Sequence, residues 1–129
     1  KVADISVVLD LEELEDLTIK SNNGEGDTEV LDLATFASTK TQTEILKKFT
    51  TLDLEGCKIE DLSGIGWLTL LENLNVKDNK ITTLAPIQNF DKLMVLLVTT
   101  NPGLSASDTA YSNLKTAIKS RGGTVEGPE

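Results

Sequence analysis

The chain contains no histidine among its 129 residues. Histidine is the side chain whose ordinary pKa lies closest to neutral pH, so its absence removes the usual proton shuttle of acid–base enzymes. It also excludes serine–histidine–aspartate triads, cysteine–histidine pairs and the two-histidine zinc motif of metalloproteases. We therefore expect a protein that is not an enzyme and has no catalytic residues.

Cysteine is almost as rare, because Cys57 is the only one. A single thiol forms neither an internal disulfide nor a thiol-pair metal site. Residues 21–32 loosely follow the ligand spacing of a calcium loop, but the first position lacks Asp and the twelfth lacks Glu. A plain turn is the better interpretation of that loop, and we expect no metal and no cofactor.

Basic residues are scarce, with 12 Lys and Arg against 21 Asp and Glu and a net charge of −9. Binding to nucleic acid requires clustered Lys and Arg, so a nucleic-acid partner is not expected. Acidity of this kind is typical of a secreted protein, in which the net charge maintains solubility. No stretch approaches the roughly 20 apolar residues of a membrane span. The chain begins at Lys1 without Met or a signal peptide, as a processed or trimmed N-terminus would.

What the chain does contain is a pattern that recurs every 22 residues from Leu52 onward. The equivalent positions are Leu52/Leu74/Leu96, Leu54/Val76/Val98, Cys57/Asn79/Asn101, Ile59/Ile81, Leu62/Leu84, Ile65/Ile87, Leu68/Phe90 and Leu71/Leu93. This is the signature of a leucine-rich repeat. One coil of such a repeat cannot bury its apolar side alone, so coils stack and their strands form one parallel sheet.

The pattern predicts a short α/β leucine-rich repeat solenoid, with residues 1–129 as a single domain and a monomer. Strands at 51–55, 73–77 and 95–99 would form a parallel sheet on the concave side. The apolar period of three after each strand favours short 3₁₀ turns on the outer side. Residues 51–104 would form the regular repeats, between an N-terminal cap with degenerate coils (1–50) and a C-terminal cap (105–129).

The N-terminal part fits the repeat less well. Leu11, Leu14, Leu17 and Ile19 follow the template up to Asn22 and predict a first, degenerate coil. Residues 30–33 form a short β-type run with two possible places. They form either the strand of a second parallel coil or a hairpin with residues 17–20 across the turn at 22–28. Residues 41–48 favour a short helix.

The last coil changes character, as terminal repeats that seal an open core do. After a turn at residues 101–103, Ser107 is a candidate N-cap for a helix that ends near Ser120. The apolar face of this helix would comprise Ala110, Leu114, Ala117 and Ile118, with Tyr111 alongside. Gly122 and Gly123 would end it, and residues 124–126 would add one more strand.

Residues 52–104 resemble the 22-residue repeats of bacterial surface leucine-rich repeat proteins, the internalin type among them. The run LDLEGCKIEDLSGIGWLTLLENLNVKDNKITTLAPIQNFDKL carries the likeness. It departs from the family in having only two to three regular coils, and in Gly103, which stands where Ile59 and Ile81 do. The resemblance implies a protein that binds other proteins or glycans, and a secreted or cell-surface location in a bacterium.

Three equivalent residues, Cys57, Asn79 and Asn101, are predicted to be structural. At this position, which we call the ladder position, the side chain turns inward and bonds backbone groups where the chain leaves the strand. Cysteine is tolerated there as a small, weak donor. The alternative of a reactive Cys57 thiol requires an electropositive surrounding, whereas Glu55, Glu60 and Asp61 are close in sequence.

The period of two directs the alternate strand residues to the concave face, our candidate binding surface. They are Thr51, Asp53, Glu55, Asn73, Asn75, Lys77, Val95, Leu97 and Thr99. Val95 and Leu97 are apolar where solvent is expected, which indicates a contact patch unless a helix or loop covers them. Five coils would present a strip on the order of 300 Å². A standard interface uses about 800 Å² per partner, so this face alone would bind weakly.

Other candidates are weaker. Trp67 and Leu70 lie off the core pattern, and an exposed Trp often anchors a partner, but packing on the neighbouring coil is the simpler interpretation of Trp67. Carboxylate pairs such as Glu60 and Asp61 lie on outer turns with no opposed pair to suggest hydrolysis.

The sequence thus favours a non-catalytic module for protein–protein or cell-surface recognition, whose ligand is a protein or a surface glycan. Two alternatives stay open: an intracellular scaffold or regulatory repeat domain, and the non-catalytic part of a longer enzyme. A signal peptide or lipobox upstream of Lys1 in the gene would favour the first function, and sequence beyond Glu129 would test the last.

Overall fold

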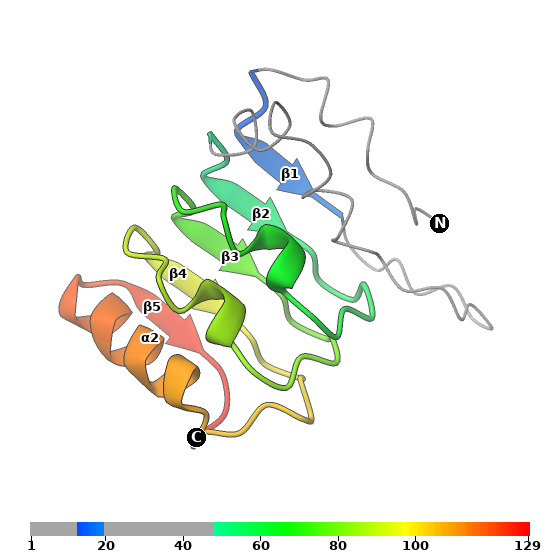
Figure 1. Ribbon diagram of the computed structural model, residues 1–129, viewed down its shortest axis with the longest axis vertical. Helices are drawn as coiled ribbons and strands as arrows, with labels where there is room; N and C mark the ends of the chain where they lie inside the picture. The colour runs from blue at the N-terminus through cyan, green and yellow to red at the C-terminus, as the bar shows by residue number, and fades with distance from the viewer. Residues whose placement is uncertain (1–12, 20–47) are drawn as a thin grey trace.

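The computed structural model describes residues 13–19 and 48–129 and contains one parallel sheet with strand order β1-β2-β3-β4-β5 (Figure 1). The strands lie side by side in sequence order, and a helix closes the C-terminal end of the stack. The fold predicted from the repeat is confirmed, since the strands around Leu52, Leu74 and Leu96 are adjacent and parallel. The elements are β1 Asp16–Thr18, β2 Thr51–Asp53, η3 Ser63–Ile65, β3 Asn73–Asn75, η4 Ala85–Ile87, β4 Val95–Leu97, α2 Thr109–Ser120 and β5 Thr124–Glu126.

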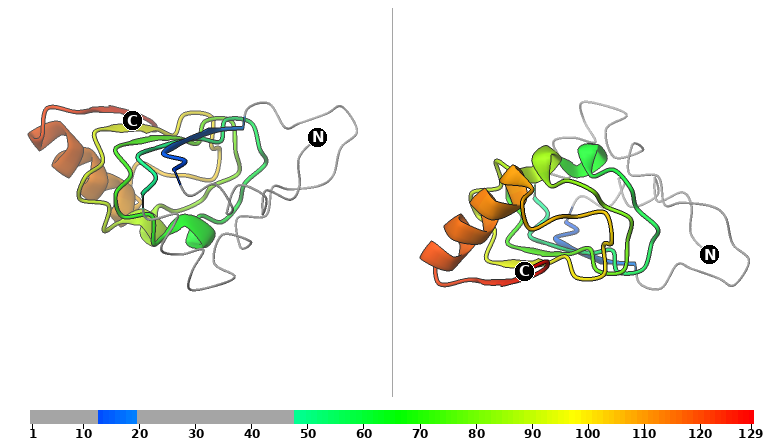
Figure 2. Two further views of the ribbon diagram at one scale, coloured as in Figure 1. Left: turned by 90° about the horizontal axis from the view of Figure 1, so that it is seen from above. Right: turned by 90° about the horizontal axis from the view of Figure 1, so that it is seen from below.

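The register of the sheet places the repeated apolar residues side by side. Leu17 pairs with Leu52, Leu52 with Leu74, Leu74 with Leu96, and Leu96 with Val125. Along the stack, the coils superimpose as rings with the strands on one side and the 3₁₀ turns on the opposite side (Figure 2). Each coil therefore supplies the same set of side chains to one continuous core.

The strands are shorter than predicted, with three residues where the alternation indicated five. Backbone pairing nevertheless continues past their ends, since Gly56 N donates to Lys77 O at 3.0 Å and Asp78 N donates to Thr99 O at 3.1 Å. The chain then turns away through residues with positive φ. Gly56, Asp78 and Thr100, which are 22 residues apart, have φ of 74, 54 and 57° and end their strand segments in a left-handed conformation that residues other than glycine seldom adopt.

The core consists of the inward positions of each coil. Leu52, Leu54, Ile59, Leu62, Ile65, Leu68, Leu71 and their equivalents 22 residues later are buried together with Phe49 and the helix residues Ala110, Tyr111, Leu114 and Ile118. Full burial of a leucine or isoleucine side chain contributes about 1.5–3 kcal/mol, so stacking is the main source of stability. The predicted outer turns are present as η3 and η4, which bury Ile65 and Ile87.

The first strand joins the sheet directly against the regular repeats. β1 pairs with β2, so the neighbour of Leu52 is Leu17. Ile19 N also donates to Asp53 O at 2.7 Å. The coil predicted from Leu14, Leu17 and Ile19 thus has its strand in the sheet. Leu11, Asn22, the run at 30–33, the turn at 22–28 and nearly all of the predicted helix at 41–48 lie outside the described residues.

The C-terminal cap contains the predicted helix and strand, but its N-cap is Asp108 and not Ser107. The Asp108 carboxylate accepts from Tyr111 N at 2.8 Å and from Thr83 Oγ1 at 2.7 Å, so it fastens the helix to the preceding coil as well as capping it. Ser107 instead shares a hydrogen bond with Ser105. Ala117 is only half-buried, because the apolar face is centred on Tyr111, Leu114 and Ile118.

The last coil closes the core with an aromatic ring. Gly127 stands where Leu54, Val76 and Val98 stand in the earlier coils, and a Cβ atom there would lie 2.7 Å from Tyr111 Oη and 2.7 Å from Val98 Cγ2. Tyr111 fills that space from α2 and donates its hydroxyl to Pro128 O at 3.0 Å. The helix ends at Ser120 and the chain turns through Gly122, whose φ of 81° suits glycine; β5 then pairs with β4 in parallel as predicted.

Candidate functional site

The residues predicted to form the concave face lie on one surface of the sheet, and all of them are half-buried. Two register rows cross the strands. The first is Asp16, Thr51, Asn73, Val95 and Thr124, and the second is Thr18, Asp53, Asn75, Leu97 and Glu126. Glu55, Lys77 and Thr99 follow just beyond the strand ends. The concave face is from here on defined by these three sets.

A depression of about 270 Å³ lies in the middle of this face. It is lined by Thr51, Leu52, Asp53, Asn73, Leu74, Asn75, Val95 and Leu97. Of the nine predicted concave-face residues, the structure thus brings six together and leaves Glu55, Lys77 and Thr99 outside the depression. The volume is below the roughly 300–1,000 Å³ of small-molecule pockets, and suits one inserted side chain better than a whole ligand.

The β2–β3 side of the depression is held by hydrogen bonds. Asn73 Nδ2 donates to Thr51 Oγ1 at 3.3 Å, and Asn75 Nδ2 donates to Glu55 Oε2 at 3.1 Å. The Asn75 Oδ1 atom accepts from Lys77 N at 3.1 Å, which fixes the orientation of that amide. The β4 side offers only the aliphatic groups of Val95 and Leu97, so the depression has one polar wall and one apolar wall.

Sequence reasoning missed the two outer strands as parts of this face. Asp16 and Thr18 extend it on β1, and Thr124 and Glu126 extend it on β5. Glu126 lies next to Leu97 in the register. The signal was present, because Leu17 and Val125 continue the row of Leu52, Leu74 and Leu96, and their neighbours in sequence must then face outward.

The residues at the ladder position hold consecutive coils together. Asn79 Oδ1 accepts from Cys57 N at 3.0 Å and from Ile59 N at 2.9 Å, in the coil before its own. Its Nδ2 group donates to Leu54 O at 2.9 Å and Val76 O at 3.0 Å. Asn101 repeats this arrangement one coil later, with Ile81 N as donor and Val76 O and Val98 O as acceptors. These bonds satisfy backbone groups that are buried and would otherwise lack partners.

Cys57 is buried in the same position, and its thiol donates to Ile19 O in the preceding coil at 3.2 Å. The nearest carbonyl of its own coil, Glu55 O, is 3.7 Å from the sulfur. A buried thiol that serves as a donor to backbone carbonyls is not positioned for nucleophilic attack.

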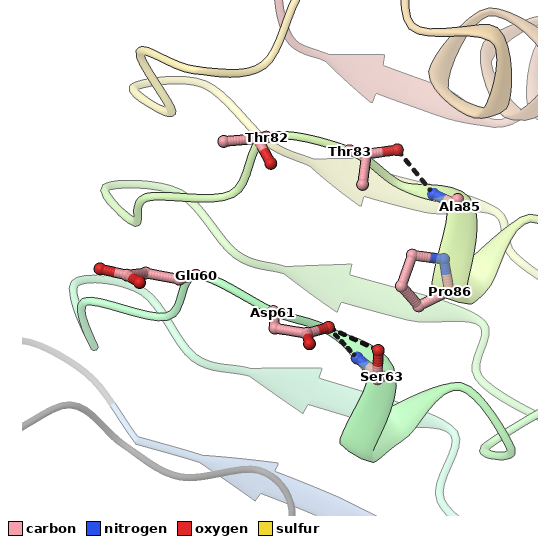
Figure 3. A pocket seen from close by; sticks show the side chains of 7 residues that line it. All are labelled: Glu60, Asp61, Ser63, Thr82, Thr83, Ala85 and Pro86. Carbon is pink, nitrogen blue, oxygen red and sulfur yellow. Dashed lines mark hydrogen bonds between the residues drawn. The ribbon is translucent and has the colours of Figure 1, made fainter.

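A larger depression of about 610 Å³ lies on the outer side, between η3 and η4 (Figure 3). It is lined by Glu60, Asp61, Ser63, Thr82, Thr83, Ala85 and Pro86. Asp61 Oδ1 accepts from Ser63 Oγ at 2.6 Å and from Ser63 N at 2.8 Å, and these two bonds lower the pKa of Asp61. Thr83 Oγ1 accepts from Ala85 N at 3.2 Å in the equivalent turn. Asp61 and Thr83 thus hold their own turns, and the smaller concave depression is the candidate site.

Trp67 and Leu70 differ in their surroundings. Trp67 is half-buried and packs against the core, as the packing interpretation requires. Leu70 is 44% exposed and is the only large hydrophobic side chain in the described residues that is exposed to this degree. It lies before β3, outside the concave face, and serves below as a matched control for Leu97.

Within residues 13–19 and 48–129, no three or more acidic, cysteine or histidine side chains converge in a way that would bind a metal ion. The loop weighed as a calcium site lies outside the described residues. No helix in the same part of the chain has the length and hydropathy that crossing a bilayer requires.

No protein-family model matches the chain, and no curated protein matches it. Among solved structures, an internalin (InlF) from Listeria monocytogenes is 26% identical, and the match covers 70% of this chain and 23% of that one with a TM-score of 0.52. Internalin C2 from the same species is 16% identical over 98% of this chain and 57% of that one, with a TM-score of 0.60. The chain therefore spans less than two thirds of either protein. The likeness to internalin-type repeats predicted from the sequence is confirmed at the level of the fold.

Proposed function

Because the chain is a short leucine-rich repeat solenoid whose structural neighbours are Listeria internalins, we propose that it is a recognition module that binds another protein through its concave face. The observation that carries this proposal is the pair Val95 and Leu97. Both are aliphatic, both are half-buried on a sheet surface, and both line the depression of about 270 Å³. An apolar wall at a surface depression is typical of a contact site.

The mechanism of such a module is display on a rigid support. Parallel strands joined by the ladder bonds of Asn79 and Asn101 hold the facing side chains in fixed rows, so little conformational entropy is lost on contact. No catalytic step forms part of the proposal, because the chain has no histidine and the Asp61 carboxylate at the outer depression holds the turn at Ser63. A panel of hydrolase assays that detected turnover by the purified chain would refute this.

We further propose that the module acts outside a bacterial cell or on its surface, by resemblance to bacterial surface repeat proteins. The intracellular scaffold and the non-catalytic part of an enzyme remain the competing functions. A secretion signal or lipobox upstream of Lys1 in the gene supports the surface location, and its absence supports the scaffold.

The binding surface is tested by affinity capture from the native environment with three baits: the parent chain, Leu97→Glu and Leu70→Glu. Both variants introduce the same charge at a leucine, but only the first lies on the concave face. We expect Leu97→Glu to lose the captured partner and Leu70→Glu to retain it. Equal recovery by Leu97→Glu and the parent would show that the concave face is not the site. Thermal melts of all three baits control for unfolding.

A further inference from the structure

The register row of Leu97 contains a carboxylate on each side of an apolar centre. In order across the strands the row reads Thr18, Asp53, Asn75, Leu97 and Glu126, so Leu97 lies between the two carboxylates, next to Glu126 and two strands from Asp53. No basic side chain stands in this row of the described sheet. The one lysine of the face, Lys77, lies in the following row and beyond the depression. The whole chain also carries a net charge of −9, which favours a cationic partner over an anionic one.

The spacing of the row can be compared with that of a bound peptide. Neighbouring strands lie about 4.8 Å apart, so the three steps from Asp53 to Glu126 span about 14 Å. An extended peptide rises about 3.3 Å per residue and directs every second side chain to the same face, so positions one, three and five span about 13 Å. The third side chain would then enter the depression while the first and fifth reach the two carboxylates.

We propose that the partner of this face is a basic protein segment that crosses the strands in an extended conformation, with the pattern basic–x–apolar–x–basic. The inference rests on the proposed function and names the chemistry of its partner. The aliphatic side chain of the segment packs on Val95 and Leu97. Its two flanking Lys or Arg side chains pair with Asp53 and Glu126, one at each end of the row.

The polar wall contributes to the fit. Asn73 lines the depression and uses its Nδ2 group on Thr51, and its Oδ1 atom is a hydrogen-bond acceptor. An N–H donor of the crossing segment satisfies this acceptor. Both ends of the Asn75 amide are hydrogen-bonded, to the Glu55 carboxylate and to Lys77 N. This side chain is therefore fixed between Leu97 and Asp53 in the register row.

The test is an NMR titration of the full chain with acetylated, amidated pentapeptides. The probe is Arg-Ser-Leu-Thr-Arg, and two controls are the charge-reversed Glu-Ser-Leu-Thr-Glu and the rearranged Arg-Arg-Ser-Thr-Leu. We expect the probe to shift the methyl signals of Val95 and Leu97 and the amide signals of Asp53 and Glu126, and to bind about tenfold or more tightly than the charge-reversed control. The rearranged peptide has the same composition without the spacing, and is expected to bind more weakly than the probe.

Isosteric variants separate charge from packing. Asp53→Asn retains the oxygen that accepts from Glu55 N, and Glu126→Gln retains the length of its side chain. Each is expected to weaken probe binding about two- to fivefold, because exposed ion pairs contribute modestly, and to reduce the salt dependence. Glu60→Gln removes a charge on the outer side and is the matched control, with no expected change.

Equal binding of the probe and either control peptide, or probe shifts confined to residues outside the concave face, would overturn this inference. The proposed function has a separate readout. A partner that is captured by the parent chain and lost with Leu97→Glu, together with a failed peptide titration, refutes the partner chemistry and leaves the recognition function intact. Recovery of the same partner by Leu97→Glu refutes the function itself.

Discussion

The side chain of Asn79 and the backbone of Cys57 join two consecutive coils: Asn79 Oδ1 accepts from Cys57 N at 3.0 Å. The same oxygen also accepts from Ile59 N, and the amide nitrogen donates to carbonyls of both coils. One buried side chain thus satisfies several backbone groups at the point where the chain leaves the sheet.

Replacing Asn79 by Ala is expected to lower the free energy of unfolding by about 1–3 kcal/mol, because buried donors and acceptors lose their partners. Urea denaturation measures the change. Asn89→Ala is the matched control, since the Asn89 side chain is exposed and is not part of the buried core. An unchanged denaturation midpoint for Asn79→Ala would contradict the structural role of the ladder position.

Replacing Leu74 by Ala removes a buried side chain from the middle strand and is expected to cost about 2–5 kcal/mol through lost burial and a cavity. Leu70→Ala makes the same change at an exposed position and should stay within about 0.5 kcal/mol of the parent. Thermal or urea unfolding of the pair distinguishes them. Similar losses for both would mean that Leu74 is not in the core.

Replacing Asp108 by Ala removes the N-cap of α2 and its bond to Thr83, and is expected to cost about 0.5–2 kcal/mol. The helix should lose its attachment to the η4 coil as well as its cap. Helix-specific amide exchange, faster for α2 than for the β2–β3 pair, is the measurement. Ser107→Ala is the matched control and should have a small effect, because Ser107 does not cap the helix.

Acid should selectively remove the contribution of Asp108. Burial raises the pKa of this carboxyl group, but hydrogen bonds from Thr83 and from the N–H groups of Tyr111, Leu84 and Ala110 outweigh burial and lower the pKa below its ordinary 3.8. Since the folded pKa is below the unfolded one, the stabilisation is present above pH 3.8 and is lost as the pH falls through the folded value. The difference in unfolding free energy between the parent and Asp108→Asn should therefore narrow below about pH 4. A constant difference down to pH 2 would contradict this assignment.

The sequence predicted the stack well because its 22-residue period is carried by buried, mostly aliphatic side chains. Leu52, Leu74 and Leu96 are adjacent as expected, and the outer 3₁₀ turns follow the apolar period of three. The strand ends were predicted two residues too late, because the alternation of half-buried and buried residues continues for two residues beyond Asp53, Asn75 and Leu97, where the strands end.

Contacts between coils were harder to predict. The choice of Asp108 over Ser107 as the N-cap depends on Thr83, a residue of the preceding coil that no local pattern connects to the helix. The same holds for the pairing of β1 with β2, which joins segments separated by an irregular stretch of sequence. The regular repeats predicted the part of the concave face on β2, β3 and β4. Its parts on β1 and β5 were missed, because those strands belong to coils that depart from the 22-residue pattern.

The ring of Tyr111 has a consequence for anyone who wishes to lengthen this scaffold. Another copy of the repeat, appended after Glu126, would bring a bulky aliphatic residue to the place of Gly127, and that place already belongs to the tyrosine and Val98. Extra units should instead be spliced between β3 and β4, where both surfaces already accept a neighbour of their own kind. The sheet would then become wider, and the packing of Tyr111 that closes the C-terminal end of the core would stay unchanged.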